Sequence, residues 1–322
     1  MTLKDKIKLL IPITRVEFIP ANSASILIGF AWAIEKHYVF NFNTIGLLLS
    51  LFFVLSSVGT LGAHWNSYSD HELDSEDPTK KELHKSLSNL GKKQLKNIII
   101  VEFGLAAVIF LLFWHQRGDL NLLGIWIAAT FFAFNYSMPP MRFKAKNLLA
   151  FISLCLVLSI LPIMFVFLST NQSLNKEFVL FLIGHTLVVY SLIIPTEIRD
   201  YEVDMSHKIS TMTVWLGLKK AIIFAQNLIV VGTVFIITSY YRTELFNNNL
   251  FPSISLLFVL GGNGFVFYKL NQLRKIIYLS DNTGNQNQEV SDFAKDNPKW
   301  ITISSTGSMV VALITIVGKI FF

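Results

Sequence analysis

The chain has 322 residues, of which 52% are hydrophobic and only 15% charged, and its net charge is +6. Soluble proteins have roughly 25% charged residues, so this composition excludes an ordinary soluble domain and predicts a protein that crosses a membrane several times. A single cysteine, Cys155, excludes a disulfide within the chain. Nothing in the composition indicates nucleic-acid binding.

Nine apolar stretches approach the length of a membrane-spanning helix. We therefore expect an all-α fold with nine transmembrane helices, formed as a single domain over residues 1–322. The polar segment 280–298, rich in Asn and Gln, predicts a flexible loop before the last span. The expected spans are residues 17–35, 43–65, 97–115, 120–137, 147–169, 177–197, 220–241, 249–269 and 300–319.

The basic residues alternate between the two sides of the predicted bundle. If the N-terminus is cytoplasmic, the N-terminal arm and the inward connections carry 22 of the 27 Lys and Arg residues, and each outward segment carries one. Cytoplasmic loops of membrane proteins are enriched in Lys and Arg. The bias predicts an integral, multi-pass membrane protein with a cytoplasmic N-terminus and a C-terminus on the opposite side.

An acidic cluster follows the second predicted span, on the cytoplasmic side. Asn66, Asp70 and Asp74 are four residues apart, and a step of four on a helix keeps side chains on one face. The three side chains therefore form one oxygen-rich stripe. Ionisable groups beside a bilayer core are costly and usually functional, although acidic residues at a span end can also simply solvate a loop.

Aromatic and basic residues follow the fourth span, again on the inward side. Tyr136 and Ser137 precede a Pro139-Pro140 pair that stops the helix, and Arg142 and Lys144 come directly after it. A guanidinium and an ammonium group on a short connector can grip phosphate oxygens. The alternative is a positively charged anchor, which any cytoplasmic loop can carry.

A second acidic cluster closes the sixth span. Asp200 and Asp204 repeat the spacing of the first cluster, and Glu197 lies one turn earlier, as a supporting carboxylate or as part of an acceptor pocket. The predicted topology brings both clusters to the same cytoplasmic mouth. Mg²⁺ is usually bound by one or two carboxylates and shares its shell with phosphates and water. The two stripes therefore predict a site for about two or three Mg²⁺ ions around a diphosphate.

Further lysines follow each cluster. Lys80, Lys81 and Lys85 come after the first cluster, and Lys208 comes after the second. We expect one lysine in each place to reach the diphosphate and choose Lys85 and Lys208 as candidates. The remaining lysines are interpreted as ordinary interface residues.

Together these residues resemble the UbiA superfamily of intramembrane prenyltransferases, over nearly the whole chain. The resemblance implies nine transmembrane helices around a central cavity, a cytoplasmic-side active site, and Mg²⁺ held by two Asp motifs against a prenyl diphosphate. The motifs that carry it are Asn66-x3-Asp70-x3-Asp74, Tyr136-Ser-x-Pro-Pro-x-Arg142-x-Lys144, and Asp200-x3-Asp204 followed by Thr211 and Leu216-Gly217.

The resemblance also implies roles for individual positions. The four aspartates would carry catalysis and, with Asn66, bind metal, while the connector after the fourth span would contact the diphosphate through Tyr136, Ser137, Arg142 and Lys144. The stretch from Glu197 to Asp204, which includes Arg199, is similar to the form found in quinone-pathway members. The sequence departs from the family in several places, and Tyr201 and the Thr196-Glu197 pair differ from the commonest forms. It has lysines instead of an Arg-Pro pair after the first motif, and Lys208 instead of a glycine after the second.

The implied activity is Mg²⁺-dependent transfer of a prenyl group to a small-molecule acceptor in the lipid bilayer, with an aromatic, quinone-pathway-like acceptor as the first choice. A terpene cyclase that needs no acceptor, and transfer to a glycerol phosphate or phosphosugar, stay open. A cation-coupled transporter is a remote alternative, because the acids cluster at span ends rather than in mid-bilayer.

Overall fold

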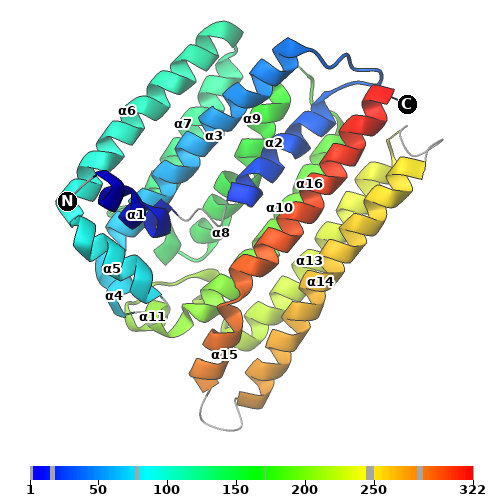
Figure 1. Ribbon diagram of the computed structural model, residues 1–322. Coiled ribbons are helices and arrows are strands. Elements are labelled where there is room, and N and C mark those ends of the chain that lie inside the picture. Colours follow the sequence, from blue (N-terminus) through cyan, green and yellow to red (C-terminus); the bar gives the residue numbers. More distant parts are fainter. Residues whose placement is uncertain are drawn as a thin grey trace.

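The computed structural model describes residues 3–14, 19–76, 80–170, 172–243, 250–280 and 286–321. Within these ranges the chain is helical and forms no β-strand beyond an isolated bridge between Lys146 and Ser210. The long helices form one bundle, with the C-terminus at one end and short helices gathered at the other (Figure 1). The predicted all-α fold is confirmed.

Eight helical segments in the described ranges are long and apolar enough to cross a membrane, and they coincide one by one with eight of the predicted spans. The first predicted span, 17–35, corresponds to the shorter helix α2 (Ile19–Ala33). The eight are α3 (Phe42–Ser69), α6 (Lys92–Arg117), α7 (Leu120–Ser137), the continuous run of α8 (Leu148–Cys155), the π-helical turn η4 (Leu156–Ile160) and α9 (Leu161–Leu168), then α10 (Lys176–Arg199), α13 (Leu218–Tyr241), α14 (Leu250–Ser280) and α16 (Asn297–Phe321).

Short helices fill the connections at the end of the bundle that carries both acidic clusters (Figure 1). They extend or brace the spanning helices, and α1 packs against α5. These helices are α1 (Leu3–Thr14), α4 (His71–Glu76), α5 (Lys81–Leu90), the 3₁₀ turn η3 (Phe143–Ala145), α11 (Tyr201–Ser206), α12 (Met212–Leu216) and α15 (Gln286–Ala294).

The expectation of a flexible loop over 280–298 is wrong for the described part of that segment. Residues Gln286–Ala294 form helix α15, which packs against α10. Val290 and Ala294 lie on one face of α15 and are buried. The Asn- and Gln-rich composition conceals this narrow apolar face, which is enough to dock a short helix onto its neighbour.

Helix α10 packs very closely against α13. A Cβ atom built on Gly184 would stand 2.7 Å from the carbonyl oxygen of Gly232, and one built on Gly232 would stand 2.6 Å from that of Gly184. Small residues at such positions let the backbones of membrane helices approach one another. The helix that carries the second acidic cluster is therefore fixed by backbone-to-backbone contact.

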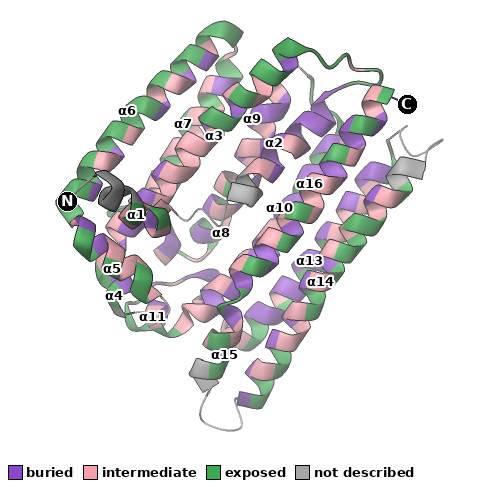
Figure 2. Ribbon diagram, in the orientation of Figure 1, coloured by how far each residue is buried: buried purple, intermediate pink, exposed green. Residues whose placement is uncertain are grey.

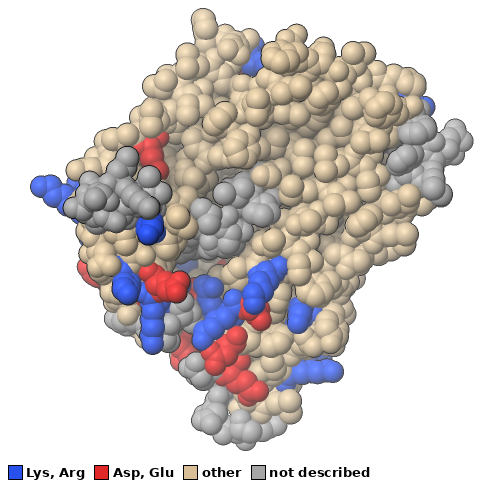
Figure 3. Space-filling view, viewed as in Figure 1, with Lys and Arg blue, Asp and Glu red and all other residues tan. Residues whose placement is uncertain are grey.

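The surface suits a lipid environment. Exposed residues follow the outer faces of α3, α6 and α14 (Figure 2), and many are large and apolar, such as Phe53 and Leu112. Lys, Arg, Asp and Glu side chains gather around α4, α5, α11 and α15, while most of the visible face beyond them is uncharged (Figure 3). This distribution fits a bundle that spans a membrane, and the cytoplasmic placement of the charged end stays a prediction.

Candidate active site

Both acidic clusters lie where a spanning helix ends and a short helix begins. Asp70 follows α3 and precedes α4, and Asp200 follows α10 and precedes α11. The backbone N–H of Asp74 donates to the carbonyl of Asp70 at 2.7 Å, and that of Asp204 donates to the carbonyl of Asp200 at 2.9 Å. Each predicted stripe therefore keeps its four-residue register, although the regular helix is interrupted at the first aspartate.

Lys80 joins the two clusters. Its Nζ atom lies 2.9 Å from Asp74 Oδ1 in the first cluster and 3.3 Å from Asp200 Oδ2 in the second. Lys80 immediately precedes α5, which packs against α4. Because one ammonium group touches carboxylates of both clusters, the clusters face each other closely enough to share a ligand.

The connector after α7 brings basic and polar groups to the first cluster. Lys144, carried by η3, is buried and forms a close ion pair with the buried carboxylate of Asp70. Arg142 Nη2 lies 3.9 Å from the same carboxylate. The hydroxyl of Ser137 donates to the side-chain oxygen of Asn66 at 2.5 Å. The structure thus places this connector directly against the first cluster.

Arg199 holds Asp200 within the second cluster. Its Nε and Nη2 atoms donate to the two carboxylate oxygens at 2.6 and 3.0 Å. Burial by itself would raise the pKa of Asp200, but the Lys80 ammonium and the Arg199 guanidinium outweigh burial and lower this pKa to about 2. Burial and the charge of Asp200 raise the pKa of Asp204 to about 7. The surroundings therefore shift the pKa values of the two carboxylates in this cluster in opposite directions.

Glu197 is buried one turn deeper in α10 and accepts three hydrogen bonds. The hydroxyl of Tyr190 donates to Oε1 at 3.2 Å, and the backbone N–H and hydroxyl of Thr213 donate to Oε2 at 3.0 and 2.9 Å. Thr213 belongs to α12, so this carboxylate ties α12 to α10. Neither Tyr190 nor Thr213 is singled out by the sequence. Tyr190 lies two turns before Glu197 on α10 itself, whereas Thr213 reaches Glu197 only because α12 folds back onto α10.

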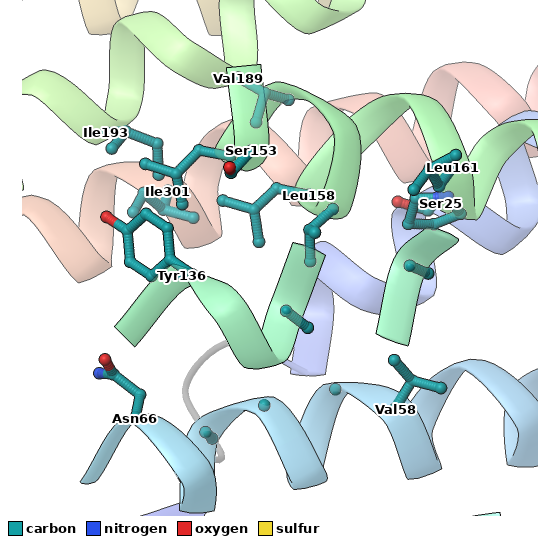
Figure 4. A pocket seen from close by; sticks show the side chains of 18 of the residues that line it. Ser25, Val58, Asn66, Tyr136, Ser153, Leu158, Leu161, Val189, Ile193 and Ile301 are labelled. Atoms are coloured by element: carbon teal, nitrogen blue, oxygen red, sulfur yellow. The ribbon is translucent and has the colours of Figure 1, made fainter. Parts of the chain in front are cut away.

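A cavity of about 540 Å³ extends from the acidic clusters into the bundle. Farther from the clusters its lining is mainly apolar and includes Val58, Leu161 and Phe165. Figure 4 shows Asn66 and Tyr136 at one end of the cavity and Val58, Leu161 and Ser25 at the other. The cavity thus joins a charged head region to an apolar channel. The head region is lined by Asn66, Asp70, Lys80, Tyr136, Lys144, Glu197, Arg199, Asp200 and Asp204.

Some predicted site residues lie apart from the cavity wall. Lys85 and Lys208 are exposed, and neither lines the cavity. Arg142 and Asp74 do not line the cavity either. Each lies next to a residue that does, Arg142 beside Asp70 and the buried Asp74 beside Lys80. The site residues predicted from the sequence do not include Lys80. Its one distinguishing signal was that it is the nearest lysine in sequence to Asp74.

The donor set fits a divalent cation that shares its shell with a ligand, rather than a closed metal cage. Across the described ranges, no three His, Cys, Asp or Glu side chains form a ready-made metal site, and Lys80 and Lys144 stand among the carboxylates. Asp74 Oδ2 is buried and has no hydrogen-bond partner among the described residues. This oxygen is available to a hard cation, which typically takes one or two carboxylates together with phosphate oxygens.

Comparison with known proteins places this geometry in a family context. A family model described as the UbiA prenyltransferase family matches residues 23–276. No curated protein matches the sequence.

Several solved structures share the fold. A UbiA homolog from Archaeoglobus fulgidus bound to GPP and Mg²⁺ gives a TM-score of 0.64 at 14% identity, covering 95% of this chain and 99% of that chain. The same homolog bound to DMAPP and Mg²⁺ gives 0.65 at 14% identity, with 96% and 99% covered. The apo structure of a UbiA homolog from Aeropyrum pernix K1 gives 0.60 at 14% identity, with 92% and 98% covered.

Proposed function

Because this chain belongs to the UbiA prenyltransferase family, we propose that it transfers a prenyl group from a prenyl diphosphate to an acceptor in the membrane, with Mg²⁺ as cofactor. The cavity carries the proposal, since it joins two acidic clusters and their basic partners to an apolar channel. A prenyl diphosphate has the matching halves, a polyanionic head and a hydrocarbon tail. The similar Archaeoglobus fulgidus structures contain GPP or DMAPP together with Mg²⁺, which supports the assignment.

The two clusters would hold the cations through Asp70, Asp74, Asp200 and Asp204. Bound Mg²⁺ neutralises charge that develops on the diphosphate and so favours its departure as a leaving group. Lys80 and Lys144 at present neutralise the aspartates. With cations bound to these carboxylates, Lys80 and Lys144 would be placed to donate to phosphate oxygens of the diphosphate.

In this proposal the apolar channel binds the prenyl tail and keeps bulk water away from the reacting carbon. Loss of the diphosphate leaves positive charge on the allylic carbon, and water at that carbon would hydrolyse the donor. Tyr136 lines the cavity beside the clusters, and an aromatic ring at this boundary suits a neighbouring cation. The carbon–oxygen bond to diphosphate breaks first, the acceptor nucleophile then forms the new bond to the allylic carbon, and the acceptor gives up one proton to solvent.

An aromatic, quinone-pathway-like acceptor is the substrate class that we put first. The support is the similarity of the stretch from Glu197 to Asp204 to the second motif of quinone-pathway members. Glu197 borders the cavity next to the diphosphate end, where an acceptor would approach.

The test is a product screen with the purified protein in lipid nanodiscs. Mg²⁺, geranyl, farnesyl or geranylgeranyl diphosphate, and a panel of aromatic acceptors are supplied, and products are identified by mass spectrometry. We expect a prenylated acceptor and free diphosphate, both abolished by EDTA and restored by Mg²⁺. A hydrocarbon formed without any acceptor, or ion flux in liposomes without prenyl transfer, would overturn the proposal in favour of a cyclase or a transporter.

A further inference from the structure

We propose that Asn297, the first residue of α16, is a positioning residue for the second acidic cluster. In this proposal α15 and the start of α16 brace the end of α10, from which Asp200 and Asp204 emerge. The segment lies beyond residues 23–276, which the family model matches. The inference rests on the proposed function, because it takes the second cluster to bind metal and diphosphate.

Asn297 makes two hydrogen bonds to the last turns of α10. Its side chain is completely buried, and Nδ2 donates to the carbonyl of Leu192 at 2.8 Å and to Oγ1 of Thr196 at 2.7 Å. The two acceptors are four residues apart and lie on the same face of α10. One amide group therefore spans a full turn of the helix and fixes that turn from outside.

The braced turn leads directly to the second cluster. The carbonyl of Thr196 accepts the backbone N–H of Asp200 at 3.1 Å, and Thr196 also lines the cavity. Pro195 lies inside α10 just before this point and has no N–H to donate. Because α10 lacks one of its own backbone hydrogen bonds here, a hydrogen bond from another helix contributes more to stabilising the end of α10.

A second contact comes from α15. The hydroxyl of Ser291 donates to the carbonyl of Arg199 at 3.4 Å, at the last residue of α10. Arg199 in turn holds the carboxylate of Asp200 through two hydrogen bonds. The 291–297 segment therefore contacts α10 on both sides of Glu197, at Leu192 and Thr196 and again at Arg199.

We expect this brace to affect function as well as folding. A displacement of about 1 Å at a group that positions substrate can cost roughly 100-fold in rate. Metal ligands are similarly sensitive to the outer partners that orient them, at about 10- to 100-fold. A residue that only stabilised the fold would change the melting temperature and leave the metal affinity of the folded protein unaltered.

The test compares Asn297→Leu with Thr302→Val on the same helix. Leucine has the same branching and number of side-chain heavy atoms as asparagine, although its methyl groups are larger, and it has no donor. The hydroxyl of Thr302 donates to the carbonyl of Pro298 within α16. Binding of Mg²⁺ with inorganic pyrophosphate is measured by isothermal titration calorimetry on folded protein, followed by the Mg²⁺ dependence of turnover.

We expect Asn297→Leu to weaken binding of Mg²⁺ and pyrophosphate about 10-fold, to raise the half-saturating Mg²⁺ concentration, and to lower kcat about 10- to 100-fold. The KM for the acceptor should stay the same, and Thr302→Val should match the wild type. Folded Asn297→Leu protein with wild-type binding of Mg²⁺ and pyrophosphate would overturn the proposal.

If Asn297→Leu fails to fold, Thr196→Val provides the second variant, because it removes one of the two acceptors and leaves the Leu192 carbonyl in place. Weaker binding in Thr196→Val supports the brace, and unchanged binding overturns it. Wild-type protein that binds Mg²⁺ and pyrophosphate but transfers no prenyl group would refute the proposed function, while the binding comparison would still decide the role of Asn297.

Discussion

The two acidic clusters share a spacing but are carried by helices in very different surroundings. In the most apolar 18-residue stretch of α10, 67% of the residues are buried, compared with 17% in α3. Helix α10 lies against α13, α15 and α16, whereas α3 lies against α6, α7, α2 and α1. The second cluster is therefore attached to a helix that is mostly buried in the bundle, and the first to a helix with few buried residues, one face of which lines the cavity.

The clusters also obtain their counter-charges differently. Asp200 is held by its sequence neighbour Arg199, while Asp70 depends on Lys144, which is distant in sequence and arrives with η3. Lys80 then links the two sides. The same i, i+4 acidic pattern is therefore neutralised by a sequence neighbour in the second cluster. In the first cluster it is neutralised by a residue that only the tertiary structure brings close.

The largest effects are expected from Asp70→Asn and Asp200→Asn. Each substitution removes a carboxylate charge with little change in shape, and we expect kcat to fall about 100-fold or more. Mutation of residues that only orient a metal ligand already lowers metal affinity or activity about 10- to 100-fold. Their stabilities should differ. Asp70→Asn leaves the buried Lys144 without its counter-charge, which costs about 3–5 kcal/mol in a buried pair, whereas Asp200 and Arg199 are partly exposed.

Thermal melting and turnover of the purified variants check this difference. The double variant Asp70→Asn with Lys144→Met should recover stability without recovering activity, because it removes the unpaired charge but not the need for the carboxylate. Equal melting temperatures for the two single variants would show that the clusters do not differ in this way.

A smaller effect on stability is expected from the glycines that fix α10. Gly184→Ala or Gly232→Ala places a Cβ within 2.7 Å of a facing backbone carbonyl, and overpacking of this kind costs about 1–3 kcal/mol. The matched control is Gly46→Ala in α3, where nothing lies within 4 Å of the new Cβ. That change should leave stability the same or raise it by up to about 1 kcal/mol. Melting temperatures in one detergent provide the comparison, and similar losses at Gly46 and Gly184 would refute it.

The smallest effect is expected from the link between the clusters. Lys80→Met should lower kcat/KM for the prenyl diphosphate by about 10-fold, the equivalent of one modest hydrogen bond to a charged group. The exposed lysines Lys85 and Lys208 serve as controls, and Lys85→Met and Lys208→Met should leave kcat/KM nearly unchanged. Steady-state kinetics with varied donor concentration tests the set, and a loss in Lys85→Met as large as that in Lys80→Met would argue against Lys80 as the linking residue.

The sequence was informative where local pattern determines structure. Apolar length places the spanning helices, and four-residue spacing places Asp70 with Asp74 and Asp200 with Asp204 on common faces, even though the regular helix is interrupted at Asp70 and at Asp200. Composition failed over 280–298, because the few buried residues of α15, such as Val290, are outnumbered by polar ones.

The contacts between segments could not be predicted in the same way. Choosing Lys80 over Lys85 requires knowing how α5 packs against α4, and spacing does not determine that packing. The pairing of Lys144 with Asp70, the hydrogen bonds of Thr213 to Glu197 and those of Asn297 to α10 all join residues that are far apart in the chain or brought together by a turn. Each of them depends on tertiary structure rather than on a local motif.

An experimental structure of the protein with Mn²⁺ and a non-hydrolysable prenyl thiodiphosphate tests the central claim most directly, since Mn²⁺ can replace Mg²⁺ and be located by its anomalous signal. We expect metal ions at about 2.1 Å from carboxylate oxygens of both acidic clusters, the thiodiphosphate between the clusters, the prenyl tail in the apolar channel, and Lys80 no longer bridging Asp74 and Asp200. Metal bound by one cluster alone or by neither, with Lys80 still between the two carboxylates, would contradict a shared diphosphate site.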